Sequence, residues 1–185
     1  MIVITTSSTR KDLEGILALQ RRNLSAGLSA EEKENQGFVT VAHGLADLEK
    51  MQSYEPNIIA KDGEKVIAYV LAMTEKSKSD IPVLISMFDG FNHIKYKGKA
   101  IAEYKYLVVG QVCVDKNYRG QGLFDKCYLE YREYFELDYD FAITEVAIIN
   151  QRSMNAHKRV GFEEIYTAKD LTGLEWSVVI WDWKK

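Results

Sequence analysis

Cysteine and proline are scarce in this sequence, which contains only two of each. The two cysteines, Cys113 and Cys127, lie in apolar surroundings without the CxxC or Cys/His spacing of metal ligands. The sequence therefore indicates neither a disulfide framework nor a zinc site. We expect both cysteines to be buried, reduced thiols, and we expect no metal.

Long hydrophobic runs are also absent. No stretch approaches the ~18 uninterrupted apolar residues of a membrane-spanning helix. Residues 1–11 lack the basic region and following apolar stretch of a secretory signal. These absences predict a cytoplasmic protein that does not act at a membrane.

An excess of positive charge is missing as well, since 24 Lys and Arg stand against 27 Asp and Glu, a formal net charge of −3 at pH 7. Acidic and basic residues are interspersed, so the chain has no global basic field to attract nucleic acid. The remaining composition is that of a globular protein: 185 residues, 46% hydrophobic and 28% charged. That length suits one core, so we expect a single domain over residues 1–185.

The first quarter predicts a strand and two helices. A short strand over residues 2–4 precedes a helix opened by Thr9, with Asp12 three residues later as in a capping box. A second helix is expected around residues 45–51, ending before Pro56 because proline disfavours helical geometry in its predecessor.

A hairpin and an insertion follow. Residues 57–61 and 64–73 are apolar and β-prone, and Asp62-Gly63 between them predicts a two-residue turn joining antiparallel strands. Residues from about 75 to 105 then alternate between polar, apolar and basic stretches. This segment is too long for a simple loop, so we expect an insertion with its own structure.

The second half predicts a βαβ unit. Residues 106–114 and 141–149 are near-continuous apolar runs on either side of an amphipathic helix over 123–135, a pattern typical of parallel strands buried on both faces. A short helix stopping at Gly161 and two last strands complete the chain. We expect an α/β (α+β) fold with a mixed central sheet of about six to seven strands flanked by helices. The inner face of the helix is predicted to carry Leu123, Cys127, Tyr131 and Tyr134.

Residues 112–124 run from a buried strand through two glycines directly into that helix. Glycine lets the backbone approach a ligand, and the free N–H groups and positive dipole end of a helix N-terminus converge on an anion such as pyrophosphate. The segment is neither a Walker loop nor the dinucleotide fingerprint, because Gly-Lys-Ser/Thr and GxGxxG are both missing. Taken alone, the turn is explained equally well by the sterics of an α/β connection.

A second motif supplies the missing specificity. Residues 117–122, Asn-Tyr-Arg-Gly-Gln-Gly, resemble the phosphate loop Gln/Arg-x-x-Gly-x-Gly/Ala of the GNAT superfamily of acyl-CoA-dependent N-acetyltransferases, with Asn in the first position. Residues 150–162 resemble the second GNAT motif, Asn-x-x-Ala-x-x-x-Tyr-x-Lys-x-Gly-Phe, with Ser153, His157 and Arg159 replacing Ala, Tyr and Lys. Each match alone is weak, but together, at this mutual spacing, they identify the chain as GNAT-like.

The resemblance implies a GNAT-like fold whose two central parallel strands splay apart, so that unpaired backbone groups bind the pantetheine arm of acetyl-CoA. It implies acetyl-CoA as cosubstrate and no metal. Arg119 and Lys126 are candidates for the outer phosphates, or else solvated surface charges, and Asn150 is also a helix-capping residue. The cofactor residues implied are Val112, Cys113, Val114, Arg119, Gly120, Gln121, Gly122, Leu123, Phe124, Asn150 and Ser153.

Direct acyl transfer to an amine needs a base and an acid, because the attacking amine must lose its proton and the leaving thiolate must be protonated or stabilised. The resemblance places His157 where many relatives carry a Tyr beside the thioester sulfur, and Glu145 where ribosomal-protein N-terminal acetyltransferases carry a base. A further family Glu is replaced here by Val108. We therefore expect His157 as acid and Glu145 as base. The alternatives are a histidine on the polar side of a short helix and a strand Glu paired with a cation.

The acceptor site is expected in the first helices and the insertion. Lys95, Lys97 and Lys99 make the insertion locally basic, which suits a carboxylated acceptor or merely a solvated face. A small amine, a protein amine and an aminoglycoside-like sugar remain open as acceptors, the last being less suited to an insertion without strong acidity. Met87, Phe88, Phe91, His93, Tyr96 and Tyr104 are predicted to wall a pocket, or else to build a satellite core or a homodimer face.

Two other classes of function compete with the enzyme. A catalytically silent acyl-CoA-binding sensor or scaffold is supported by the replacement of Tyr by His157. An RNA- or DNA-binding domain would need a basic stripe with interleaved aromatics, and the composition gives no support for a nucleic-acid partner.

Overall fold

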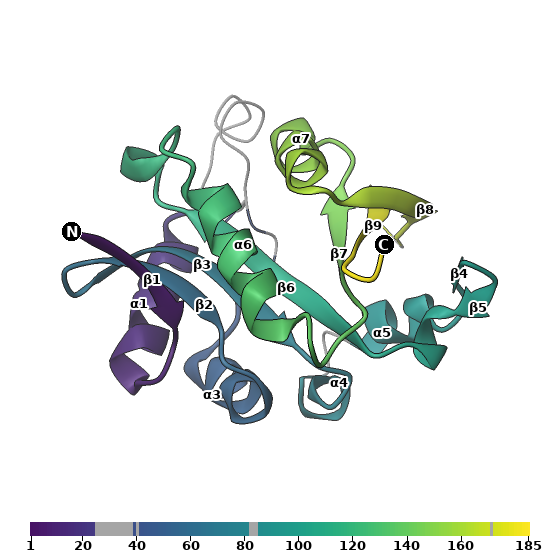
Figure 1. Ribbon diagram of the computed structural model, residues 1–185, viewed down its shortest axis with the longest axis horizontal. Helices are drawn as coiled ribbons and strands as arrows, with labels where there is room; N and C mark the ends of the chain where they lie inside the picture. Colours follow the sequence, from purple (N-terminus) through teal and green to yellow (C-terminus); the bar gives the residue numbers. More distant parts are fainter. Residues whose placement is uncertain (25–38, 40, 82–84, 171) are drawn as a thin grey trace.

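The computed structural model describes residues 1–24, 39, 41–81, 85–170 and 172–185. Its centre is a seven-stranded sheet in the order β1-β2-β3-β6-β7-β9-β8, beside a two-stranded hairpin, β4-β5. Strands β6 and β7 are parallel, and the other neighbours in the large sheet are antiparallel. Helices cover both faces of the sheet (Figure 1), so the predicted α+β fold with a mixed sheet is confirmed.

The predicted N-terminal elements are present. Strand β1 (Ile2–Thr6) leads to α1 (Arg10–Arg21), whose first turn is closed by Thr9 and Asp12. The Asp12 amide donates to Thr9 Oγ1 at 3.2 Å, and the Thr9 amide donates to Asp12 Oδ2 at 3.0 Å. This is the predicted capping box, which satisfies backbone donors that the helix itself cannot pair.

Helix α3 (Leu45–Tyr54) ends just before Pro56, as predicted. Strands β2 (Ile58–Asp62) and β3 (Lys65–Met73) form the predicted antiparallel hairpin, but its loop is Gly63-Glu64, one residue later than expected. The shift arises because Asp62 still pairs with Lys65. Gly63 has a φ of 57°, which suits the first loop position of a type II′ turn.

The predicted insertion has its own structure: α4 (Ser77–Asp80), α5 (Ile85–Phe91), β4 (Lys95–Tyr96), β5 (Lys99–Ala100) and the 3-10 turn Ile101–Glu103. Phe88 and Phe91 are fully buried and pack into the main core, where the Phe91 ring meets Tyr106 at a centroid distance of 6.2 Å. The structure therefore supports a core role for these two phenylalanines, in the main core rather than in a satellite core.

The βαβ unit consists of β6 (Tyr106–Val114), α6 (Leu123–Phe135) and β7 (Phe141–Ala147). The parallel pairing covers only 106–108 against 141–143. Beyond it, the Thr144 hydroxyl donates to the Val109 carbonyl at 2.8 Å, and the strands diverge. The predicted splay of the two central strands is thus present.

The predicted inner face of α6 is wrong at one position. Tyr134 is 49% exposed, whereas Tyr128 and Phe135 are buried beside Leu123, Cys127 and Tyr131. The apolar stripe advances along the helix by four residues at a time, which favours 135 over 134. Strand β7 also ends earlier than predicted, at Ala147.

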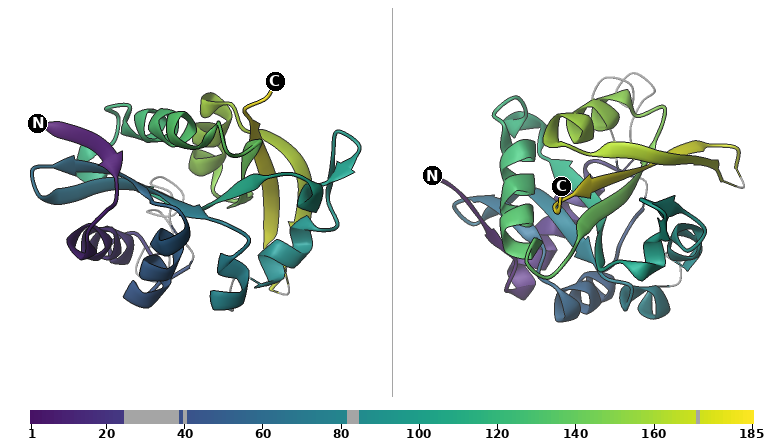
Figure 2. Two further views of the ribbon diagram at one scale, coloured as in Figure 1. Left: turned by 60° about the horizontal axis from the view of Figure 1, so that its bottom comes forward. Right: turned by 45° about the vertical axis from the view of Figure 1, so that its right-hand side comes forward.

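The C-terminal part contains α7 (Gln151–Val160), β8 (Glu163–Lys169) and β9 (Glu175–Asp182). Gly161 caps α7 with a φ of 121°. Residues from α1, α3 and α5 build the core on one face of the sheet, and residues from α6 and α7 build the core on the other, as the left view of Figure 2 shows. Both cysteines are free and buried. Among the residues described, no helix combines the length and apolarity needed to cross a bilayer.

Candidate active site

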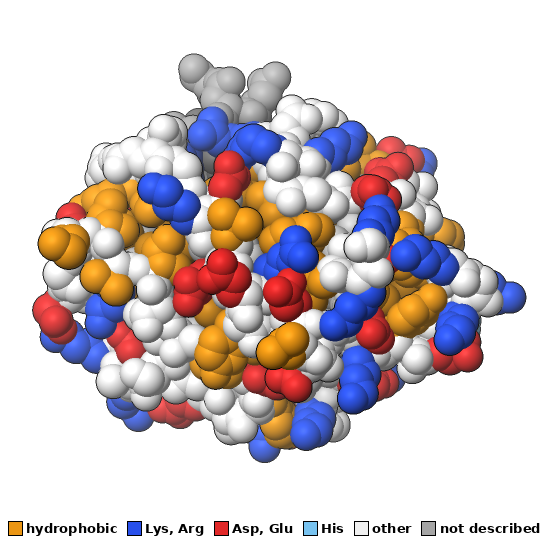
Figure 3. Space-filling model, in the orientation of Figure 1, with side chains coloured by type: hydrophobic (Ala, Val, Ile, Leu, Met, Phe, Trp, Pro, Cys, Tyr) orange, Lys and Arg blue, Asp and Glu red, His pale blue; other side chains and the backbone are white. Residues whose placement is uncertain are grey.

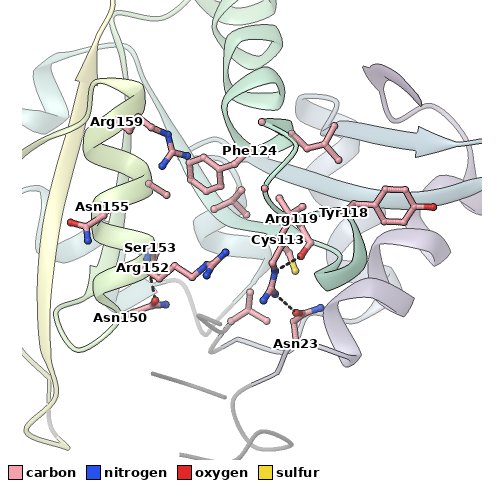
Figure 4. A pocket seen from close by; sticks show the side chains of 17 residues that line it. Asn23, Cys113, Tyr118, Arg119, Phe124, Asn150, Arg152, Ser153, Asn155 and Arg159 are labelled. Carbon is pink, nitrogen blue, oxygen red and sulfur yellow. Dashed lines mark hydrogen bonds between the residues drawn. The ribbon is translucent and has the colours of Figure 1, made fainter. Parts of the chain in front are cut away.

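The divergence of β6 and β7 opens a cavity of about 500 Å³, here called the cofactor cavity, between the end of β6 with its following loop and helix α7 (Figure 4). The residues predicted to bind the cofactor line this cavity except Gln121 and the phosphate candidate Lys126, both of which are exposed. The splay therefore brings the two sequence motifs to opposite walls of one space. Seven further residues, which were not predicted from the sequence, also line the cavity: Asn23, Val39, Tyr118, Arg152, Asn155, Ala156 and Arg159.

The glycine loop opens the N-terminus of α6 onto this cavity. Gly120 and Gly122 have φ values of 75° and 72°, and Gly122 is the residue that caps α6. A Cβ at either position would meet nothing closer than the Lys126 Cε at 4.0 Å. The glycines are therefore required by left-handed backbone geometry rather than by crowding, and they leave the helix's first N–H groups facing the cavity.

Two arginines face one another across the cofactor cavity. Arg119 from the loop and Arg152 from α7 point into it from opposite sides (Figure 4). Burial, and then the positive charge of Arg152, lower the pKa of the Arg119 guanidinium. Arg119 donates to Val114 O at 3.1 Å and to Asn23 Oδ1 at 2.9 Å. Two like charges aimed at one space favour an anion between them.

A third arginine borders the same cavity. Arg159 of α7 pairs with Asp125 of α6 at 2.6 Å, and its guanidinium lies 6.0 Å from the Phe124 ring centroid. Lys and Arg side chains also lie along the upper rim of the face drawn in Figure 3, whereas Asp and Glu side chains gather over α6 near its centre.

Asn150 occupies the junction of the site. It precedes α7, and its side-chain oxygen accepts from the Ser153 amide at 3.2 Å, so the capping role is present. Asn150 and Ser153 line both the cofactor cavity and a second, narrower space.

That second space, the wedge cavity, has a volume of about 80 Å³ and lies between the diverging strands. Glu145 on β7 lines it and makes no hydrogen bond or ion pair with any residue that the structure describes. Burial raises the pKa of Glu145 above its ordinary value. A desolvated carboxylate without a counter-cation is a stronger proton acceptor than an exposed one.

His157 also lines the wedge cavity, but both of its ring nitrogens are engaged. Nδ1 lies 2.8 Å from the Ser153 carbonyl and therefore donates to it, while Nε2 lies 2.7 Å from the Tyr128 hydroxyl and accepts from it. Burial lowers the pKa of His157 to about 4. The ring is thus neutral at pH 7.

The family model of the Acetyltransferase (GNAT) family matches residues 28–162. The chain belongs to the GNAT acetyltransferase family. No curated protein matches the chain in sequence.

Solved structures with the same fold include GNAT enzymes from bacteria and plants. The Streptococcus agalactiae GNAT acetyltransferase has a TM-score of 0.67 at 12% identity, covering 100% of this chain and 96% of its own. Arabidopsis thaliana NAA60 in complex with acetyl-CoA has 0.61 at 16%, covering 98% and 99%. The Escherichia coli ribosomal-protein-S18-alanine N-acetyltransferase has 0.60 at 13%, covering 97% and 92%. At these identities the likeness concerns the fold.

Some predicted residues lie away from the two cavities of this GNAT chain. Lys126 and the aromatics of the insertion line neither. Val108, at the position where the resemblance implied a Glu, is fully buried in the core. Within the described ranges, no group of three or more His, Cys, Asp and Glu side chains is arranged to hold a metal ion.

Proposed function

We propose that this protein is an N-acetyltransferase that moves an acetyl group from acetyl-CoA to a primary amine by direct attack in a ternary complex. The observation that carries the proposal is that the cofactor cavity and the wedge cavity adjoin one another where β6 and β7 diverge. One is lined by three arginines and a helix N-terminus, and the other contains an unpaired carboxylate.

The cofactor cavity has the chemistry that acetyl-CoA requires. The backbone amides behind Gly120 and Gly122, with Arg119 and Arg152, would hold its phosphates. The unpaired edge of β6 from Val112 to Val114 would bind the pantetheine arm as another strand does, since the parallel pairing stops at Val108. Asn150 would donate to the same arm. Bound there, the thioester supplies an activated acetyl group at the splay.

Glu145 would act as the base, directly or through a water molecule. An ammonium has no lone pair, so the carboxylate must take a proton before the amine nitrogen bonds to the acetyl carbon. The carbon–sulfur bond then breaks, and the sulfur leaves with the electron pair as a thiolate. The second proton of the amine nitrogen, released as the amide forms, neutralises that thiolate. The raised pKa of Glu145 brings its basicity closer to that of the amine.

The predicted acid, His157, lines the wedge cavity together with Glu145 but has no proton available for donation at neutral pH. Its Nδ1 hydrogen is committed to Ser153 O and its Nε2 lone pair to Tyr128. This arrangement favours His157 as a positioning residue that holds α7 against α6. Its role as acid stays a prediction.

Isothermal titration with acetyl-CoA tests the proposal. We expect binding by the wild type and its loss in Gly122→Glu, which places a negative side chain at the phosphate loop. Gly63→Glu is the matched control, because Gly63 also has a positive φ but lies in the β2–β3 turn. The absence of binding by the folded wild type, or equal binding by both variants, would overturn the proposed site.

A silent acyl-CoA-binding sensor is the second candidate, favoured by the enclosure of His157. Thiol release from acetyl-CoA in the presence of amines separates the two functions, because a sensor binds the thioester without turnover.

A further inference from the structure

The cofactor cavity and the wedge cavity differ in the charge of the residues that line them. The cofactor cavity is lined by Arg119, Arg152 and Arg159 and by no acidic residue among those described. The wedge cavity is lined by Glu145 and, within the same described part of the chain, by no Lys or Arg. An acceptor that reaches the thioester through the wedge cavity therefore meets a negative site first.

The polar groups around Glu145 give no substitute for a cation. Thr144 donates its only side-chain hydrogen to Val109 O at 2.8 Å, and Trp176 donates its indole hydrogen to Asp170 at 2.9 Å. Gln111 uses its amide to accept from Tyr69 at 2.5 Å and to donate to Val41 O at 2.8 Å. Asn150 and Ser153, which also line the cavity, are neutral. Among the described residues, the wedge cavity therefore offers a carboxylate to a cation and only neutral groups to an anion.

The size of the wedge cavity limits what lies beside Glu145. At about 80 Å³ it has room for a few water-sized groups, such as an amine nitrogen and its nearest carbon atoms. Whatever is attached to the carbon next to the amine must therefore lie close to the Glu145 carboxylate.

The lysines of the insertion do not alter this charge division. Lys97 pairs with Asp182 at 2.6 Å, and Lys95, Lys97 and Lys99 line neither cavity. The prediction of a carboxylated acceptor depended on these three lysines, and their positions do not support it.

We infer that the acceptor is a cationic primary amine whose neighbouring carbon bears no free carboxylate, such as an alkylamine or an amine with an amidated carboxyl group, and that free α-amino acids are rejected. This inference rests on the proposed function. A carboxylate next to the amine would lie within a few ångströms of Glu145, where repulsion between like charges is stronger than in bulk water because Glu145 is partly buried.

Matched acceptors test the inference in a thiol-release assay with acetyl-CoA. Phenylalanine is compared with phenylalaninamide and phenethylamine, and glycine with glycinamide. Amidation lowers the basicity of the amine whereas decarboxylation raises it, so a shared preference for both over the acid cannot come from basicity. We expect kcat/KM to be about tenfold or more higher for the members without a carboxylate, after allowance for partial screening by solvent.

Two variants of equal charge change serve as probe and control. Glu145→Gln lowers turnover of every acceptor, but it should also bring the ratio between matched acceptors toward one, since the repelling charge is gone. Glu133→Gln, on the exposed side of α6, should leave the ratio unchanged. Equal or better use of the free acids, or a ratio that survives Glu145→Gln, overturns the inference.

A titration of the CoA-bound protein with the same compounds separates this inference from the proposed function. If no acceptor is turned over but the amines bind more tightly than the acids, the charge preference stands and the transferase proposal fails. If the acids bind equally well, the inference fails whatever the turnover.

Discussion

The hydroxyl oxygen of Tyr128 lies 2.7 Å from Nε2 of His157, and the two side chains are 0% and 2% exposed. Because the Nδ1 hydrogen of the same ring is directed at Ser153 O, Nε2 carries no hydrogen and Tyr128 is the donor. The bond joins α6, which begins at the phosphate loop, to α7, which follows Asn150 and carries Arg152. The two walls of the cofactor cavity are thus tied together behind the site.

Replacing Tyr128 by Phe removes this donor and leaves Nε2 buried without a partner. We expect the free energy of unfolding to fall by about 1–3 kcal/mol, the usual effect of an unsatisfied buried polar atom. Urea denaturation measures it. Tyr134→Phe on the same helix is the control, because Tyr134 is half exposed, and equal stability losses in both variants would contradict the assignment.

The buried histidine predicts a pH dependence of stability. Since burial lowers the pKa of His157 from 6.5 to about 4, the unfolded chain binds a proton at this residue more readily than the folded chain does. Its contribution to stability is therefore complete above pH 6.5 and is lost as the pH falls toward 4, by roughly 3 kcal/mol.

His157→Gln should flatten the stability curve of the protein over that window, measured by urea denaturation at a series of pH values. His43 is also buried with a lowered pKa, so the difference between wild type and variant isolates the effect of His157. The exposed His93→Gln should leave the curve unchanged. A wild-type slope that persists in His157→Gln would show that the ring titrates normally.

Gly161 predicts a large effect of a single methyl group. A Cβ at this position would lie 2.8 Å from Trp181 Nε1, and the residue's φ of 121° is strained for alanine. We expect Gly161→Ala to lower the melting temperature and to cost about 2–4 kcal/mol of stability. Gly173→Ala, with a φ of 86° and open space around it, measures the backbone strain alone and should cost less.

Local patterns predicted most of the fold. Patterns among residues close together in the chain predicted the capping box at Thr9, the hairpin before Lys65 and the buried runs of β6 and β7. Such patterns can be recognised directly in a sequence. The predicted positions of the turn at Gly63 and of the inner face of α6 each differ from the structure by one residue. Hairpin register and helix rotation depend on packing against residues far away in the chain.

The candidate site was predictable only where a motif covered it. Arg152 lies inside the second motif, and its position seven residues before Arg159 places both on one helical face, a signal that was available but unused. Asn23 had no such signal, since its contact with Arg119 joins residues 96 positions apart. The enclosure of His157 by Tyr128 likewise depends on tertiary packing, so a motif position alone gave the ring an acid role that its surroundings do not favour.

The position of Glu145 in the wedge cavity predicts a pH dependence of the reaction. If Glu145 takes the proton from the bound ammonium, kcat/KM for acetyl transfer, expressed against the ammonium form of the acceptor, should fall as the pH is lowered through the raised pKa of this carboxyl group. Glu145→Gln should abolish that acidic limb and reduce the rate by about 10²–10⁴-fold, while leaving acetyl-CoA affinity unchanged, because Glu145 lines the wedge cavity and not the cofactor cavity. His157→Phe is the informative comparison. If His157 is a neutral positioning residue, the acidic limb of the pH profile of His157→Phe should lie at the same pH as in the wild type. A change confined to the basic limb would instead identify His157 as the acid.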